Sequence, residues 1–234
     1  MHIKKAFTMI ELVFVIVVMG IIAAVALPRF AADNVQDAMD QILSDIRYTQ
    51  HLALVDNVID QGIPRDTRWQ SAFWTIQFQK TTDGGGDWAY TIGSDSDYSS
   101  KISLNEAAVD SRDGRPIFGD VTASATNVSP KVFITKKFGI TNIDFAIGCD
   151  VPTGAGGANN ASHVAFDNFG RPHKGHFVAA GVAPAAASPD YSSTMQGNCT
   201  IAFTFAGGET SWITIQRETG YACVSDVAGV CRTD

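Results

Sequence analysis

A long apolar segment near the start of the chain constrains this protein more than any other feature. The 21 residues of 7–27 contain only two polar side chains, Thr8 and Glu11. A helix of roughly 20 apolar residues is long enough to cross a bilayer. Lys4 and Lys5 precede the segment and no comparable basic cluster follows it directly, which predicts that the N-terminus stays in the cytoplasm. We therefore expect a single-pass membrane anchor at 7–27 with the rest of the chain on the outer side.

Glu11 is the one charged residue in this predicted span. A carboxylate costs about 2.5–3.5 kcal/mol in the middle of a membrane and less near its edge. One explanation is a side chain that reaches interfacial water. The other, which we favour, is a carboxylate that has a charged partner.

Residues 4–12, Lys-Lys-Ala-Phe-Thr-Met-Ile-Glu-Leu, together with Pro28 downstream, resemble the N-terminal signature of type IV pilins and type II secretion pseudopilins. The resemblance implies that a prepilin peptidase cuts between Ala6 and Phe7 and that Phe7 is then N-methylated. It also implies that Glu11, the fifth mature residue, is needed for assembly. The implied partners are other pilin or pseudopilin subunits and an inner-membrane assembly platform. The family usually has Gly before the cut, so we expect slower processing at Ala6.

A conventional signal peptide is the alternative interpretation of the same residues. Ala24 and Ala26 form a small-x-small cleavage site after a basic and then an apolar region. The apolar segment is, however, longer than the usual 7–15 or so residues of a signal peptide, and it contains Glu11. We favour the pilin-like interpretation. The alternative function is a periplasmic binding or enzymatic domain that has a membrane anchor or a conventional signal peptide.

The predicted organisation is a leader at 1–6, a long N-terminal helix at 7–57 and a β-rich globular domain at 58–234. The chain has a formal net charge of −7 and no basic stripe, which argues against nucleic-acid binding. All four cysteines lie in the predicted periplasmic part, where an even number indicates disulfides: Cys149, Cys199, Cys223 and Cys231. Three connectivities exist, and the positions of the predicted strands favour 149–199 and 223–231.

The helix is predicted to continue beyond the membrane as an amphipathic segment ending near Asp56 and Asn57. Apolar or small residues recur at steps of three and four on one side: Val35, Met39, Ile42, Ile46, Thr49 and Ala53. Charged residues occupy much of the opposite side: Asp33, Asp37, Asp40, Asp45 and Arg47. Pro28 removes one helical hydrogen bond and should bend this helix.

Alternating apolar residues predict a hairpin of two strands, 74–78 and 88–92, around the glycine-rich segment 83–87. Residues 93–129 have only short apolar runs and are expected to be mostly irregular. Further strands are predicted at 131–135, 143–147, 162–166, 199–205, 212–216 and 221–224. These segments predict an α+β, pilin-like fold in which the long N-terminal helix packs on an antiparallel β-sheet.

The C-terminal half also resembles the GspH/FimT class of minor pseudopilins. The resemblance rests on residues 163–172, where a strand leads into a Phe-Gly turn, and on two later strands with a Gly turn near Gly220. It implies a minor subunit of a type II secretion pseudopilus or type IV pilus, located at the bacterial inner membrane and in the periplasm.

Several groups of residues are candidates for a chemical site. His163, Asp167, His173 and His176 could ligate a metal, but their glycine- and proline-rich surroundings predict a solvated turn. Acidic residues near the first hairpin offer oxygen ligands of the kind calcium uses, and a solvated surface explains them as well: Asp83, Asp87, Asp95 and Asp97. The glycine-rich segment 154–157 lacks the third glycine and the following helix of a dinucleotide-binding turn. With no recognisable nucleophile motif, we expect no enzyme activity, no cofactor and no metal.

Overall fold

The computed structural model describes residues 8–56, 72–81, 86–97, 99, 101–122, 125–145, 148–149, 162–174 and 194–232, without the side chains of 23–33, 162 and 174. The chain divides into two compact units, Met1–Asp37 and Ala38–Asp234. Helix α1 (Met9–Val55) contributes its first part to one unit and its second part to the other. Pro28 lies inside α1, and the bend expected there stays a prediction.

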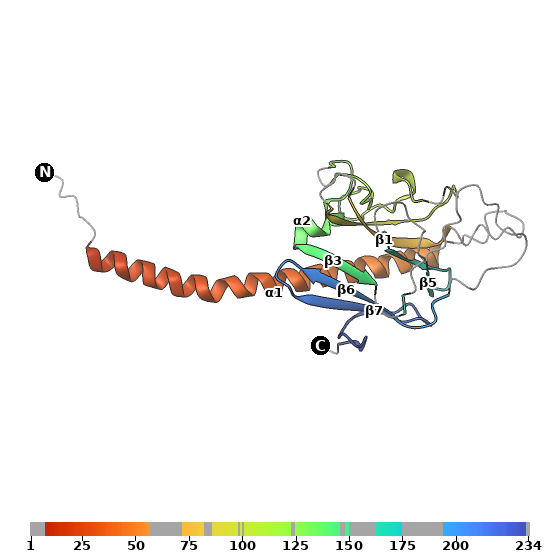
Figure 1. Ribbon diagram of the computed structural model, residues 1–234. Coiled ribbons are helices and arrows are strands. Elements are labelled where there is room, and N and C mark those ends of the chain that lie inside the picture. Colours follow the sequence, from red (N-terminus) through yellow and green to blue (C-terminus); the bar gives the residue numbers. More distant parts are fainter. Residues whose placement is uncertain are drawn as a thin grey trace, which may run out of the picture. The chain divides into compact units, whose positions relative to one another are not determined.

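The second part of α1 forms one wall of the globular unit 38–234 (Figure 1). The predicted stripe is confirmed, because its members in this unit are buried: Met39, Ile42, Ile46, Thr49 and Ala53. Asp45 is also buried, with 3% of its surface exposed, so its predicted place on the polar side is wrong. Buried partners from distant segments, Lys131 and Tyr90, make this position suitable for a carboxylate. The helix ends at Val55, where the Asp56 side chain accepts a hydrogen bond from Trp74.

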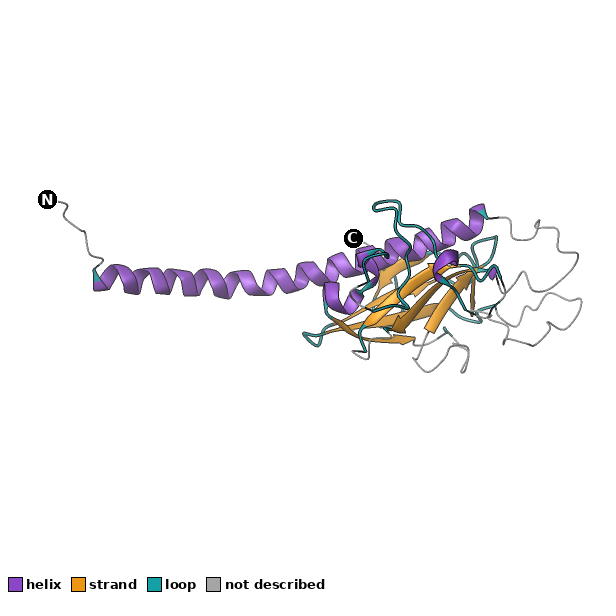
Figure 2. Ribbon diagram, turned by 90° about the horizontal axis from the view of Figure 1, so that it is seen from above, coloured by secondary structure: helices purple, strands orange, loops and turns teal. Residues whose placement is uncertain are grey.

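The predicted antiparallel strands are present except the one at 131–135, and they are divided between two four-stranded sheets (Figure 2). The first sheet has the order β2-β1-β4-β5: β1 (Trp74–Lys80), β2 (Trp88–Gly93), β4 (Ser162–Phe166) and β5 (Pro172–Lys174). The second has the order β3-β6-β7-β8: β3 (Ile140–Phe145), β6 (Cys199–Phe205), β7 (Thr210–Ile215) and β8 (Ala222–Ser225). The α+β plan of a helix with antiparallel strands is therefore confirmed.

An aromatic cluster joins the two sheets in one core. The ring of Phe78 in β1 lies 6.0 Å from that of Tyr90 in β2 and 5.7 Å from that of Phe203 in β6. All three side chains are fully buried, as are Ile42 and Ile46 of α1. Burying aromatic side chains of this size contributes several kcal/mol, so this cluster is central to the stability of the unit.

The strand predicted at 131–135 is wrong. Its place is taken by the 3₁₀ turn η4 (Pro130–Val132) and the short helix α2 (Ile134–Phe138). Pro130 favours the start of a helical turn, and Gly139 ends α2 with a left-handed backbone (φ +74°). A short buried apolar run does not distinguish a strand from a helical turn by its periodicity. In the region predicted to be irregular, the described part contains the 3₁₀ turn η3 (Leu104–Glu106) and two isolated bridges.

Candidate functional site

The first turn of α1 is closed by a capping box between Thr8 and Glu11. The Thr8 backbone N–H and its hydroxyl donate to the same Glu11 carboxylate oxygen at 3.0 and 2.9 Å. The Glu11 N–H in turn lies 3.3 Å from the Thr8 hydroxyl oxygen, to which it donates. These contacts satisfy donors that a helix start otherwise leaves without partners. The spacing Thr-x-x-Glu is a recognised sequence signal for this arrangement, and the sequence analysis missed it.

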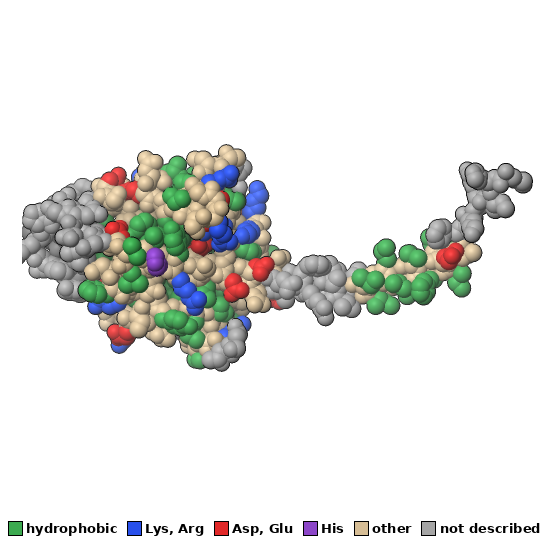
Figure 3. Space-filling view, turned by 180° about the vertical axis from the view of Figure 1, so that it is seen from behind, with side chains coloured by type: hydrophobic (Ala, Val, Ile, Leu, Met, Phe, Trp, Pro, Cys, Tyr) green, Lys and Arg blue, Asp and Glu red, His purple; other side chains and the backbone are tan. Residues whose placement is uncertain are grey.

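The helix surface that follows is apolar and exposed. Most large side chains between Met9 (84% exposed) and Ile22 (62% exposed) have more than half of their surface open (Figure 3). Glu11 is the one charged side chain in this stretch. Such a continuous apolar surface is typical of a segment that another apolar environment covers.

No helix is both long and apolar enough to span a membrane among the residues that the structure describes. Phe7 and Ala6 lie outside those residues, as do the side chains of 23–27 within the predicted span.

The fold and this N-terminal geometry define an α+β protein with a capped, exposed, apolar helix start. A family model, the prokaryotic N-terminal methylation motif, matches residues 1–27. This match supports the predicted resemblance to the type IV pilin and pseudopilin family. No curated protein and no solved structure gives a significant match to the chain.

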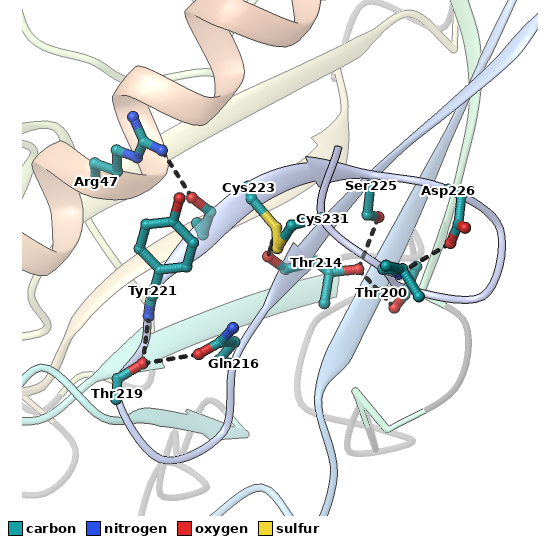
Figure 4. Close-up of a disulfide and its surroundings, with 12 residues drawn as sticks. Arg47, Thr200, Thr214, Gln216, Thr219, Tyr221, Cys223, Ser225, Asp226 and Cys231 are labelled. Carbon is teal, nitrogen blue, oxygen red and sulfur yellow. Dashed lines mark hydrogen bonds between the residues drawn. A yellow bond between two sulfur atoms is a disulfide. The ribbon is translucent and has the colours of Figure 1, made fainter. Parts of the chain in front are cut away.

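Two disulfides join the pairs that the sequence analysis favoured. Cys149 pairs with Cys199, 50 residues later, and Cys223 pairs with Cys231, 8 residues later. The first cysteine pair is buried. The second closes a loop after β8 near the outer edge of the second sheet (Figure 4).

The C-terminal loop lies beside a row of buried hydroxyl groups. The Thr214 hydroxyl lies 2.9 Å from that of Thr200 and 2.8 Å from that of Ser225, across β6, β7 and β8 (Figure 4). Arg47 of α1 donates to the Ala222 carbonyl at 2.9 Å, which ties the helix to the start of β8. These neutral and backbone contacts stabilise the sheet and present no reactive group.

Two glycine turns meet at the end of α1. The Gln50 side-chain amide donates to the Gly170 carbonyl at 2.9 Å and to the Thr219 carbonyl at 2.8 Å. These are the turns on which the resemblance to GspH/FimT-class pseudopilins rests. Their meeting depends on Gly220, where an added Cβ would lie 2.0 Å from the Gly170 oxygen.

The predicted solvated turn around the histidines is wrong for the part that the structure describes, because His163, Asp167 and His173 are all buried. His176 lies outside the described residues. The Asp167 carboxylate closes its turn by accepting hydrogen bonds from Arg171 and lies 3.2 Å from the His173 ring nitrogen. Burial of this carboxylate raises its pKa, but the bonds from His173 and Arg171 outweigh burial and lower the pKa of Asp167 to about 2. The arrangement is that of a structural ion pair.

The fold brings together only some of the acidic residues that are candidate calcium ligands. Asp95 and Asp97 form a group with Glu106 in which the carboxylate oxygens lie within 4.8 Å of one another. Asp87 is half-buried just before the start of β2, and Asp83 lies outside the described residues. Glu106 already accepts hydrogen bonds from Ser103, Ser96 and Asp97. These donors explain the cluster without a bound ion, and they lower the pKa of Glu106 against the opposing effect of burial.

A buried ionic network is the main feature that sequence reasoning missed. The Lys131 ammonium lies 2.8 Å from the Asp45 carboxylate and 3.1 Å from that of Asp110. The Tyr90 hydroxyl donates to Asp45 and accepts from the Gln41 amide. Burial and the negative charge of Asp45 raise the pKa of Tyr90 well above its usual value. Lys131 is 86 residues from Asp45, and no local sequence signal predicts such a pairing.

The glycine-rich segment 154–157 lies outside the described residues.

Proposed function

We propose that this protein is a structural subunit of a type IV pilus or a type II secretion pseudopilus. The observation that carries the proposal is the methylation motif at residues 1–27, which contains the capped start of α1 and its exposed apolar surface. The α+β fold with one long N-terminal helix is consistent with such a subunit. A structural role fits better than a catalytic one, because the polar groups described above stabilise turns, sheets and a helix contact.

In the proposed pathway, the chain is held in the inner membrane by residues 7–27 with the domain 58–234 in the periplasm. A prepilin peptidase removes residues 1–6 by cutting between Ala6 and Phe7, and Phe7 is methylated on its new amino group. An assembly platform then transfers the subunit from the bilayer to a filament. Apolar helices that leave lipid need an equally apolar environment, which neighbouring helices provide by close packing.

Glu11 has a defined part in this proposal. Its carboxylate lies within hydrogen-bonding distance of the Thr8 N–H, one residue from the proposed new N-terminus. Cleavage before Phe7 creates a positive amine, and the amine of an adjacent subunit offers a partner that offsets desolvation of the carboxylate. The pairing sets the axial position of a subunit, because a misplaced subunit leaves both charges without partners.

The finer assignment is to a minor subunit of the GspH/FimT-like kind. The meeting of the Gly170 and Gly220 turns at Gln50 supports it, because both segments that carry that resemblance build one structural feature. The proposed partners are other pilin or pseudopilin subunits.

Mass spectrometry of the mature protein tests this function. We expect a chain that begins with N-methylated Phe7, together with a released leader of residues 1–6. A chain that begins at Leu27 would instead support a conventional signal peptide and the alternative periplasmic domain. A chain that retains Met1 would contradict processing altogether.

Substitutions at two positions make the test specific. Ala6→Gly restores the residue usual in the family and should speed processing, whereas Ala6→Leu should block it by enlarging the residue before the cut. Ala26→Leu alters the competing cleavage site and is the matched control, since it should leave the mature N-terminus unchanged. A mature N-terminus that changes with Ala26→Leu but not with Ala6→Leu would overturn the proposed processing.

A further inference from the structure

A cavity of about 450 Å³ opens on the globular unit between two of its segments. One side is the turn that contains Asp110, Arg112 and Asp113. The other side is formed by η4 and α2, which supply Lys131, Lys136 and Lys137. A volume of this size accommodates a small organic molecule or one or two amino-acid side chains.

The two carboxylates at the cavity are already engaged by protein donors. Asp110 accepts from the Arg112 N–H and the Ser129 hydroxyl, each at 3.0 Å, and lies 3.1 Å from the Lys131 ammonium. Burial raises the pKa of Asp110, but these bonds outweigh burial and lower its pKa. Asp113 accepts from the Arg115 N–H at 2.9 Å, and its carboxylate lies 2.9 Å from the Ser129 hydroxyl, whose single proton it shares with Asp110. Both acids therefore fix the wall of the cavity in place.

The cationic side chains are arranged differently. Lys131 is buried between Asp45 and Asp110, whereas the Arg112 side chain is 69% exposed and its Nε is 4.0 Å from Asp110. Lys136 and Lys137 are exposed on α2. Four basic and two acidic residues thus line this cavity in a chain whose net charge is −7.

The remaining lining is apolar. Ala125, Pro130 and Phe133 contribute to the wall, and Phe133 is itself buried. An apolar wall beside exposed cations suits a ligand that has both an apolar body and a negative charge.

We propose that this cavity binds an organic anion: a carboxylate on a small apolar body, held by Arg112 and Lys136 at the rim and by Phe133 and Pro130 along the wall. The carboxylate could belong to a free organic acid or to an acidic residue in a segment of another protein. Both sources share the chemistry that the cavity recognises, and the experiment separates them. This inference is independent of the processing of the N-terminus.

Saturation-transfer NMR on the full-length chain in detergent micelles measures the binding, with benzoate as the probe and empty micelles as the blank. Benzamide has the same body without the charge, and inorganic phosphate has charge without the body; phosphate has no proton signal of its own and is measured as a competitor of benzoate. We expect saturable benzoate binding, and both other probes to bind at least about fivefold more weakly, as the loss of two exposed charge contacts or of the apolar contacts implies. Equal binding of either probe, or a benzoate signal no larger than in empty micelles, would overturn the proposal.

Rim variants locate the site. The double variant Arg112→Gln with Lys136→Gln should weaken benzoate binding by about five- to tenfold, if each exposed charge contributes about threefold. Arg232→Gln removes one positive charge from an exposed position outside the cavity and should leave the affinity unchanged. Equal thermal unfolding midpoints would show that all variants are folded. Unchanged affinity in the double variant would overturn the assignment to this cavity.

A capped Glu-Phe dipeptide distinguishes the two sources. If the dipeptide displaces benzoate at a concentration below that at which benzoate itself half-saturates the cavity, the occupant is an acidic protein segment. Tight benzoate binding without displacement would identify a free organic acid.

Discussion

Glu11 lies at the third position of α1, where its carboxylate accepts two hydrogen bonds from Thr8. The capping box is sufficient to explain why a carboxylate is compatible with the helix start. It does not explain assembly, which requires a contact with another subunit. The two roles can be separated, because Thr8 contributes to the cap and is not the proposed charged partner.

We predict that Glu11→Val leaves leader cleavage and the folded globular unit intact but strongly reduces incorporation into filaments. The substitution removes the only charge of the exposed apolar stretch, and with it the proposed pairing to an adjacent amine. Crosslinking of subunits recovered from filaments measures incorporation. Thr8→Val is the matched control, since it weakens the cap but keeps the carboxylate. Equal loss in both variants would indicate that helix capping is the whole role of Glu11.

Asp167 provides a second test at the scale of one residue. Its pKa is about 2 in the folded protein against a usual 3.8, so folding stabilises the ionised carboxylate relative to the protonated one. The stabilisation is present above pH 3.8 and is lost as the pH falls through about 2. Asp167→Asn should therefore lower the free energy of unfolding by about 1–2 kcal/mol at pH 7 and by less as the pH approaches 2.

Urea unfolding of the full-length protein in mild detergent, followed between pH 7 and pH 2, measures this difference. Asp144→Asn changes an exposed carboxylate on β3 and should have little effect at any pH. A cost of Asp167→Asn that is independent of pH would show that ionisation is not its cause.

At the scale of elements, the segment of η4 and α2 is attached to α1 by buried charge. Lys131 bridges Asp45 of α1 and Asp110 of the cavity turn. A buried ammonium between two carboxylates leaves an excess negative charge, which the Tyr90 hydroxyl, the Ser129 hydroxyl and backbone N–H groups help to stabilise. These polar partners specify how the helix is placed against the segment.

We predict that Lys131→Met lowers the free energy of unfolding by about 3–5 kcal/mol, because two buried carboxylates then lose their cation. Lys136→Met in the adjacent helix removes an exposed charge and should cost less than about 0.5 kcal/mol. Urea unfolding at pH 7 compares the two variants. A Lys131→Met variant as stable as the Lys136→Met variant would contradict the proposed importance of the network.

The contact between the two glycine turns gives another prediction. Gly220 has φ +67° and no room for a Cβ, whereas Gly208 has φ +85° with nothing within 4 Å of an added Cβ. Gly208→Ala should cost about 1–2 kcal/mol from backbone strain alone. Gly220→Ala should cost clearly more, because the Gly170 carbonyl and Gln50 must move as well. Thermal unfolding of both variants measures the difference, and equal costs would show that the turns are not in tight contact.

At the scale of the whole molecule, residues 38–234 form a compact unit that contains the buried stripe of α1, both sheets and both disulfides. In the chain-entropy description, the 50-residue disulfide contributes about 4 kcal/mol and the 8-residue disulfide about 2.5 kcal/mol. The globular unit therefore has a core and covalent links of its own.

We predict that a chain starting at Ala31 is soluble and folded when it is exported to an oxidising compartment. A chain starting at Ser44 loses the buried Met39 and Ile42 and should aggregate. Size-exclusion chromatography, together with circular dichroism and a count of free thiols, distinguishes the two. Aggregation of the longer chain, while the full-length protein folds in detergent, would contradict the division of α1 into an assembly part and a core part.

The sequence by itself determined the features that depend on local pattern. Three features each depend on residues within a few helical turns: the methylation motif, the start of α1 at a Thr-x-x-Glu box, and the buried stripe around Ile42 and Ile46. The strands 162–166 and 199–205 were predicted with their observed bounds, because an apolar or alternating run between turn residues is a local signal.

Tertiary structure alone decided which distant segments meet. The division of the strands into two sheets, the burial of Asp45 against Lys131 and the cavity beside Arg112 all depend on contacts between segments far apart in the chain. The same holds for 130–138, where a buried apolar run became helical rather than extended. Periodicity shows which side of an element is apolar, but the burial of a charge becomes favourable only when a partner from another segment is in place.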